Sequence, residues 1–141
     1  MHRRIALGGV LLLTVCIWSF AQQPKVVSVP ARQTPASSGR EMFADYCASC
    51  HGGDGKGGGP AAAALKVPAT DLTQLARQNG GKFPARRVAK AISGEAGIPA
   101  HGSKEMPVWG PVFLSMSQQH ESVARLRIAN LTDYIQSLQQ K

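Results

Sequence analysis

The sequence predicts an all-α domain over residues 38–141, and three observations support this prediction. Apolar residues recur at helical intervals along residues 121–140, where Val123, Leu131 and Ile135 belong to one stripe. No segment after residue 37 alternates apolar and polar residues with the period of a strand. Aromatic residues make up only 6% of the chain, which has 15 glycines and 9 prolines, so a large apolar cofactor would help to complete the core.

The N-terminal residues 1–21 read as a secretory signal peptide. A short basic start precedes an apolar stretch, and small residues follow at Ser19 and Ala21. An uncleaved membrane anchor is the main alternative, because residues 5–21 approach the length that spans a bilayer. A lipoprotein signal at Cys16 is disfavoured by the bulk of Val15 before it. The chain is therefore expected to be periplasmic, with membrane association only through an uncleaved N-terminal segment.

Residues 22–37 contain three prolines among small and polar residues, which predicts a flexible linker. A helix is then expected to begin after Ser37 or Ser38, with Glu41 completing a capping-box pattern. Gly39 and Phe43 share one face of this helix. We expect that face to serve ordinary core packing against the C-terminal stripe.

Cys47-Ala48-Ser49-Cys50-His51 is the attachment signature of c-type haem. Positions i and i+3 lie on one face of a helical turn, so Cys47 and Cys50 can both form thioethers to one porphyrin. His51 then follows as the proximal iron ligand. Half a zinc site would need a second Cys or His pair at ligand spacing. A thioredoxin-like redox pair would need a preceding strand.

The remaining segments are assigned from turn and cap signals. The glycine-rich residues 52–60 lack a phosphate-binding signature and predict a tight wrap against the porphyrin. We expect a short turn at 61–65, a helix that starts at Thr70 or Asp71, runs through Ala76 and is stopped by Asn79-Gly80-Gly81, and a helix from Pro84 to Gly94. Residues 94–110 are predicted to be irregular, and the last helix to start at Ser117 or one of the polar residues after it.

Together these segments resemble class I cytochromes c. The matching residues are Gly39-x-x-x-Phe43, the C-x-x-C-H motif with Gly52, Gly57-Gly58-Gly59-Pro60, Met106-Pro107-Val108-Trp109-Gly110 and Leu131-x-x-Tyr134-Ile135-x-x-Leu138. The resemblance implies about four helices around one covalently bound haem.

The resemblance also implies the surroundings of the haem. Met106 would be the sixth iron ligand, Pro60 would offer its carbonyl to the second ring nitrogen of His51, and Trp109 would shield the haem or bind a propionate. His101, Met116 or an open site remain alternatives to Met106. His101 and His120 otherwise read as surface histidines.

The implied function is single-electron transfer on a His/Met-ligated haem, with no catalytic residues. A haem subunit of a larger periplasmic oxidoreductase is the main alternative, and a haem sensor or enzyme with an open sixth site is a further one. The formal charge of +8, or +6 without residues 1–21, suits redox partners with acidic docking surfaces. Arg86, Arg87 and Lys90 would serve such docking or form a merely solvated face, and no nucleic-acid-binding module is present.

Overall fold

The computed structural model describes residues 31–95 and 108–140, and every regular element within them is a helix. The all-α prediction is thus confirmed for this part of the chain. The elements are, in order, α1 (Gly39–Tyr46), α2 (Ala48–His51), the short 3-10 helices η1 (Ala62–Ala64), η2 (Leu72–Gln74) and η3 (Arg77–Asn79), α3 (Ala85–Ser93), α4 (Trp109–Met116) and α5 (Glu121–Ser137). Among the described helices, none has the length and apolar character needed to cross a membrane.

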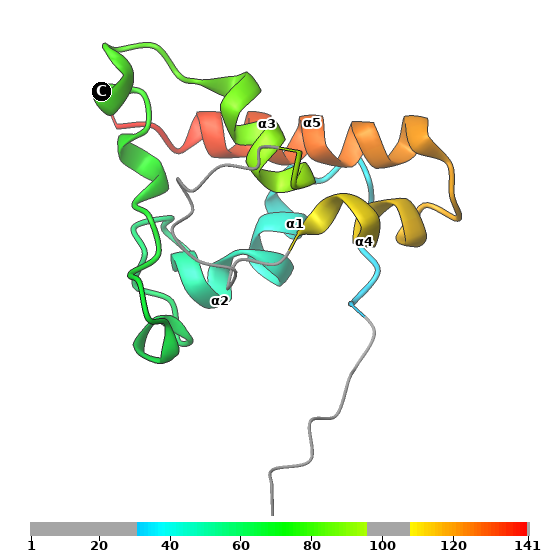
Figure 1. The fold of residues 1–141 in the computed structure, drawn as a ribbon, viewed down its shortest axis with the longest axis horizontal. Coiled ribbons are helices and arrows are strands. Elements are labelled where there is room, and N and C mark those ends of the chain that lie inside the picture. Colours follow the sequence, from blue (N-terminus) through cyan, green and yellow to red (C-terminus); the bar gives the residue numbers. More distant parts are fainter. Residues whose placement is uncertain (1–30, 96–107, 141) are drawn as a thin grey trace, which may run out of the picture.

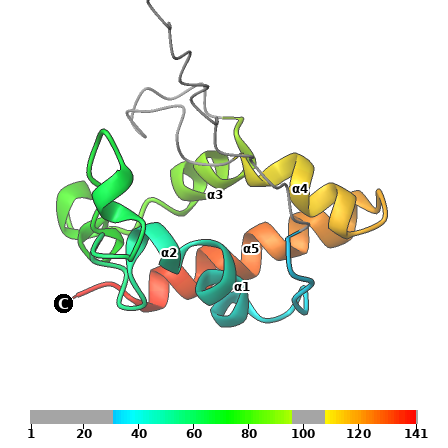
Figure 2. The same cartoon turned by 90° about the horizontal axis from the view of Figure 1, so that it is seen from below.

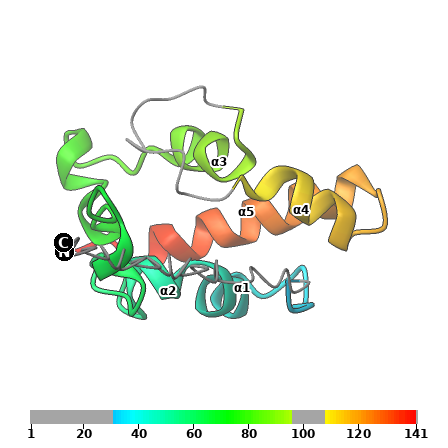
Figure 3. The same ribbon diagram turned by 60° about the horizontal axis from the view of Figure 1, so that its bottom comes forward.

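The long helix α5 forms the axis of the domain, and α1, α3 and α4 all pack against it (Figure 1). Helices α1 and α3 lie on opposite sides of α5, as Figure 2 and Figure 3 show from two further directions. The side chains that fill the centre and lie entirely out of solvent are Met42, Phe43, Phe113 and Leu131. Each of these four comes from α1, α4 or α5, so the core is made where those helices meet.

Helices α1 and α5 pack closely against each other through the faces that the sequence predicted. Gly39 lies against the backbone of Asn130, and the rings of Phe43 and Tyr134 pack with their centroids 5.3 Å apart. Helix α1 starts where expected, since the Ser38 hydroxyl accepts a hydrogen bond from the Glu41 backbone N–H at 3.2 Å. The first helix and the C-terminal stripe therefore meet on the predicted faces.

Helix α4 is an element that the sequence did not predict. Its second and third residues are Gly110 and Pro111, which read as helix breakers in an isolated sequence. Proline is nevertheless tolerated in a first turn, because N–H groups there have no intrahelical acceptor. Ser117 ends α4 and does not start α5, which begins at Glu121. The prediction that the last helix starts at Ser117 or at a polar residue just after it is thus confirmed for the second alternative, since His120 is the N-cap residue of α5.

Two other predicted helices have different outcomes. The segment after Asp71 forms two short 3-10 helices where one longer helix was expected, although Asp71 does cap it by accepting from the Thr73 N–H at 2.9 Å. Little of this segment is buried beyond Leu72 and Thr73, so tertiary packing gives a longer helix little support. Helix α3 follows the prediction: Val88 and Ile92 are buried and Gly94 closes it with φ of 82°.

Residues 31–37, the described part of the predicted linker 22–37, are bound to the helices. For these residues the expectation of a flexible linker is therefore corrected. Three backbone carbonyls, spaced two residues apart, each accept a hydrogen bond from a side chain of α1 or α5. The pairs are Tyr46 Oη to Arg32, Arg127 Nη1 to Thr34 and Asn130 Nδ2 to Ala36. We call residues 31–37 the N-terminal strap. Every second carbonyl points toward the domain, as it does in an extended chain that lies along a surface.

Arg127 is the buried centre of this attachment. Its side chain donates to the Thr34 carbonyl at 2.8 Å and to the Ser117 hydroxyl at 3.3 Å, and Nη1 lies 3.9 Å from the Met42 sulfur. No carboxylate is among its hydrogen-bond partners in the described residues. A buried guanidinium is tolerated because oxygen acceptors replace the water that it loses. Arg127 thereby joins the N-terminal strap, α1, α4 and α5.

Two glycines let the end of α3 lie against the start of α4. A Cβ on Gly94 would overlap the Val108 side chain, with the Val108 Cβ 3.3 Å away. A Cβ on Gly110 would overlap the Ser93 carbonyl, whose carbon would lie 3.2 Å away. The chain therefore leaves α3 and enters α4 at nearly the same place. We refer to Ser93, Gly94, Val108 and Gly110 as the neck.

Candidate functional site

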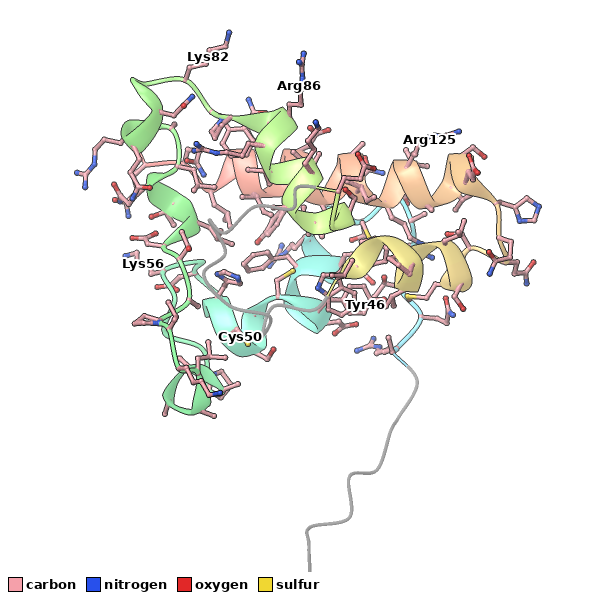
Figure 4. The ribbon with its side chains drawn as sticks, viewed as in Figure 1. Tyr46, Cys50, Lys56, Lys82, Arg86 and Arg125 are labelled. Carbon is pink, nitrogen blue, oxygen red and sulfur yellow. The ribbon has the colours of Figure 1, made fainter. Side chains whose placement is uncertain are left out.

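The C-x-x-C-H motif forms a single helical turn directly after α1. The Cys47 N–H still bonds the Phe43 carbonyl at 2.9 Å, and the N–H groups of Cys50 and His51 both return to the Cys47 carbonyl, at 3.1 and 2.9 Å. Cys47 is 9% exposed and Cys50 is half-buried, and both thiols are free. Figure 4 shows Cys50 on α2. The two sulfurs are not joined to each other and have the i, i+3 spacing that two thioethers to one porphyrin require.

Burial raises the pKa of the Cys47 thiol to about 12, and the neighbouring Cys50 adds to the rise. A thiol with such a pKa is neutral near pH 7. A neutral sulfur suits this position, because the thioether that Cys47 would form with a haem vinyl group is also uncharged and would lie against an apolar macrocycle. The site therefore does not resemble the thiolate-stabilising surroundings of a catalytic cysteine.

His51 is oriented by a backbone carbonyl on its Nδ1 side. Its Nδ1 lies 3.0 Å from the Thr70 carbonyl oxygen, and a carbonyl can only accept, so Nδ1 carries the proton. The Nε2 lone pair is then left for a metal. Burial lowers the pKa of His51, while the bond to Thr70 acts in the opposite direction. The imidazole is accordingly neutral near pH 7, as an iron ligand must be.

Thr70 takes the role that the family resemblance had implied for Pro60. The segment at Pro60 runs back along α2 instead: the Gly59 N–H bonds the Cys50 carbonyl at 3.1 Å, and the Ala61 N–H bonds the Ser49 carbonyl at 2.8 Å. Pro60 itself is exposed. The carbonyl that orients His51 thus belongs to a residue that the sequence analysis had considered only as a helix cap.

The glycine-rich loop places Thr70 beside His51. The Gly57 N–H bonds the His51 carbonyl at 2.7 Å, and the Leu72 N–H bonds the Gly55 carbonyl at 2.8 Å. Gly57 has φ of 92° and lies so close to Ala69 that a Cβ would overlap the Ala69 carbonyl oxygen. Residues 69–72 are therefore held against the loop that follows His51. The loop is thus tightly folded on itself, and its contact with the porphyrin remains a prediction.

Gly57→Ala is expected to release Thr70 from His51. The left-handed φ and the Ala69 carbonyl both oppose a side chain, which predicts a loss of about 1–3 kcal/mol in the free energy of unfolding. In the haem-loaded protein, loss of the acceptor on Nδ1 makes His51 a weaker donor, so the midpoint potential rises. Chemical denaturation and a redox titration measure the two effects.

Gly58→Ala is the matched control, since a Cβ at Gly58 would meet no atom within 4 Å. It should leave both the stability and the potential close to those of the unmodified protein. Equal effects of the two substitutions would show that Gly57 does not hold Thr70 in place.

Trp109 packs beside the C-x-x-C-H turn. Its ring stacks on Tyr46, with centroids 4.8 Å apart and planes at 28°, and Phe113 packs against both rings. Tyr46 immediately precedes Cys47, so the start of α4 is fixed to the start of the motif. The predicted role of Trp109 in shielding the haem or binding a propionate remains a prediction.

Of the other candidate ligands, the structure describes only Met116 and the surface histidine His120. Met106 and His101 fall outside the described residues. Met116 ends α4, away from α2 (Figures 1 and 3), where it lines a surface cavity of about 410 Å³ with Ala31, Gln33, Pro111, Val112 and Ser115. His120 is exposed, as predicted for a surface histidine, and its Nδ1 lies 2.9 Å from the Ser117 carbonyl.

The geometry separates the alternatives for a C-x-x-C motif. A helix, α1, precedes Cys47 in place of the strand that a thioredoxin-like pair requires. In the part of the chain that the structure describes, no group of three His, Cys, Asp or Glu residues is arranged to hold a metal ion by itself. Two unpaired cysteines on one helical turn and a histidine whose Nε2 is left for a metal instead fit covalent haem. The class defined is thus a helical protein with a covalently attached haem.

The comparison with protein families identifies this class. The family model described as Cytochrome c matches residues 36–139, so the chain belongs to the cytochrome c family. The predicted class I c-type cytochrome and its fold are confirmed. No curated protein and no solved structure matches the chain. Membership implies covalently bound haem c and haem-based electron transfer.

Proposed function

We propose that the protein is a periplasmic electron carrier with one haem, whose iron is ligated by His51 and Met106. The observation that carries this proposal is the state of His51: its Nδ1–H is bound to the Thr70 carbonyl and its Nε2 is left for iron. Bound haem supplies a one-electron couple between ferric and ferrous iron. The carbonyl bond makes the imidazole a stronger and better-oriented donor, which favours a permanent ligand.

Met106 is proposed as the second axial ligand because its neighbours in sequence are fixed beside the attachment turn. Val108 lies in the neck and Trp109 stacks on Tyr46. Two residues of extended chain span at most about 7 Å, so Met106 stays close to these anchors. A thioether is a soft, neutral ligand and raises the potential of the iron. With both axial positions filled, the protein needs no acid-base pair or nucleophile.

Met106→Ala tests the ligand assignment. The ferric protein should lose the weak far-red absorption band that accompanies methionine ligation, its potential should fall, and carbon monoxide should bind quickly to the reduced form. Met116→Ala is the control and should leave the band unchanged, because Met116 lies at the far end of α4. An unchanged band in Met106→Ala, or rapid carbon monoxide binding to the unmodified protein, would contradict the assignment.

The intact mass of the purified protein tests the haem count and the export signal in one measurement. A single haem added to a chain that begins at Gln22 is the expected result. A chain that retains residues 1–21 would indicate an anchor, and a second haem mass would contradict the monohaem proposal.

A further inference from the structure

One face of the domain carries basic residues without acidic neighbours in sequence. Residues 72–94 include five basic residues and no aspartate or glutamate. Four of them are exposed around the start and outer side of α3, and we call them the basic surface: Lys82, Arg86, Arg87 and Lys90. Figure 4 shows Lys82 and Arg86 near each other with their charged ends directed outward.

Two other exposed basic residues pair with carboxylates, whereas Arg40 and Lys56 are exposed without such a pair among the described residues. Arg32 pairs with Asp45 at 3.4 Å, and Arg125 pairs with Glu121 at 3.0 Å. Within the described residues, none of the four side chains of the basic surface forms such an ion pair. The cations of the basic surface therefore have no ion-pair partner among the described residues, which leaves them available to an outside carboxylate.

The helix dipole does not favour Arg86 and Arg87 at the positions where they lie. Both lie in the first turn of α3, which contains no acidic residue and has no side-chain cap. The positive end of a helix dipole favours carboxylates there and disfavours cations. The opposite side of α3 is used for packing, through Val88 and Ile92. The two arginines thus lie where folding alone would favour acidic residues.

The basic surface lies away from the attachment site. In Figure 4, Cys50 lies on the side of the domain opposite Lys82 and Arg86. The N-terminal strap, drawn in blue and cyan before α1, also begins on the side away from α3 in Figures 1 and 3. A chain held at a membrane from its N-terminus would leave the domain at that end. A protein partner therefore fits the basic surface better than that membrane does.

We propose that the basic surface docks an acidic protein surface and leaves the Cys50 side of the domain free for electron exchange. This inference rests on the proposed carrier function and adds the place where a partner binds. Guanidinium groups bind carboxylates through paired hydrogen bonds, and clustered charge of one sign steers association. The partner is thus a protein rich in exposed aspartate and glutamate.

The test uses poly-L-glutamate as the acidic probe and the haem-loaded, reduced protein. Two-dimensional NMR titration should shift the amides of residues 82–90 first, and the binding should weaken with salt. The double variant Arg86→Glu/Arg87→Glu should lower the affinity at least about tenfold. Its melting temperature should stay the same or rise, because the new carboxylates lie at the N-terminal end of α3.

Arg40→Glu/Lys56→Glu is the matched control, with the same change in net charge and with Lys56 on the loop after His51. It should retain most of the affinity. Equal losses in the two double variants, or shifts centred on residues 47–56, would overturn the inference. Tighter binding to phosphatidylglycerol vesicles than to poly-L-glutamate would also overturn it, in favour of a membrane. A reversible redox couple in every variant separates these outcomes from a failure of the carrier proposal.

Discussion

A variant with serine at both Cys47 and Cys50 is expected to retain no covalently bound haem. Thioethers need sulfur nucleophiles, and the two free thiols of the attachment turn are the only cysteines in the described residues. Each single variant should keep one thioether, because the other cysteine still lies on the same turn as His51. Haem staining after denaturing electrophoresis measures the attachment. The double variant should show none, and each single variant should show a reduced yield.

Ser49→Ala is the control for this experiment, since Ser49 lies between the two cysteines and its hydroxyl makes only a weak contact with the Cys50 sulfur at 4.0 Å. It should stain as strongly as the unmodified protein. Covalent haem in the double variant would mean that another residue attaches it. The remaining cysteine, Cys16, lies in the predicted signal peptide.

Gly39→Val is expected to cost the domain about 3 kcal/mol or more of its free energy of unfolding. A Cβ at Gly39 would overlap the Asn130 carbonyl oxygen and lie 2.8 Å from its carbon and 2.9 Å from the Tyr134 Cβ. Two of these three atoms belong to the backbone of α5, which cannot turn aside as a side chain can. The helices must therefore separate, and the ring contact between Phe43 and Tyr134 is lost with them.

Chemical denaturation of the haem-loaded protein measures this loss, with Gly53→Ala as the control. Gly53 is exposed and a Cβ there would meet no atom within 4 Å, so the control should change the stability little. A Gly39→Val protein as stable as the control would mean that α1 and α5 can move apart at little cost.

The sequence predicted those features whose signals are local. The Ser38 cap, the face shared by Gly39 and Phe43, and the C-x-x-C-H turn each depend on a few neighbouring residues. The orienting carbonyl on His51 is different, because every residue carries a carbonyl and no side chain marks which one is used. Its assignment to Thr70 in place of Pro60 required the three-dimensional path of the glycine-rich loop.

The N-terminal strap could not be predicted because its partners are far along the chain. Its carbonyls bind side chains of α1 and α5, and such contacts leave no pattern in residues 31–37 themselves. One signal was available: Arg127 lies four residues before Leu131 on the apolar stripe of α5, where a basic residue is out of place. An arginine at such a position indicates buried oxygen acceptors from another segment. Here they are those of Thr34 and Ser117.

The neck makes the length of residues 96–107 nearly independent of the rest of the domain. Its two sides are held together by Gly94 and Gly110, so the ends of α3 and α4 stay side by side whatever length of chain joins them, and a longer segment adds to the entropy of closing a loop. Doubling the length of a loop raises the entropic free-energy cost of closing it by only about 0.6 kcal/mol. The segment proposed to supply the second axial ligand can therefore be exchanged for one of different length or ligand type without redesign of the helices. This would allow a series of grafted segments to tune the potential on one unchanged scaffold.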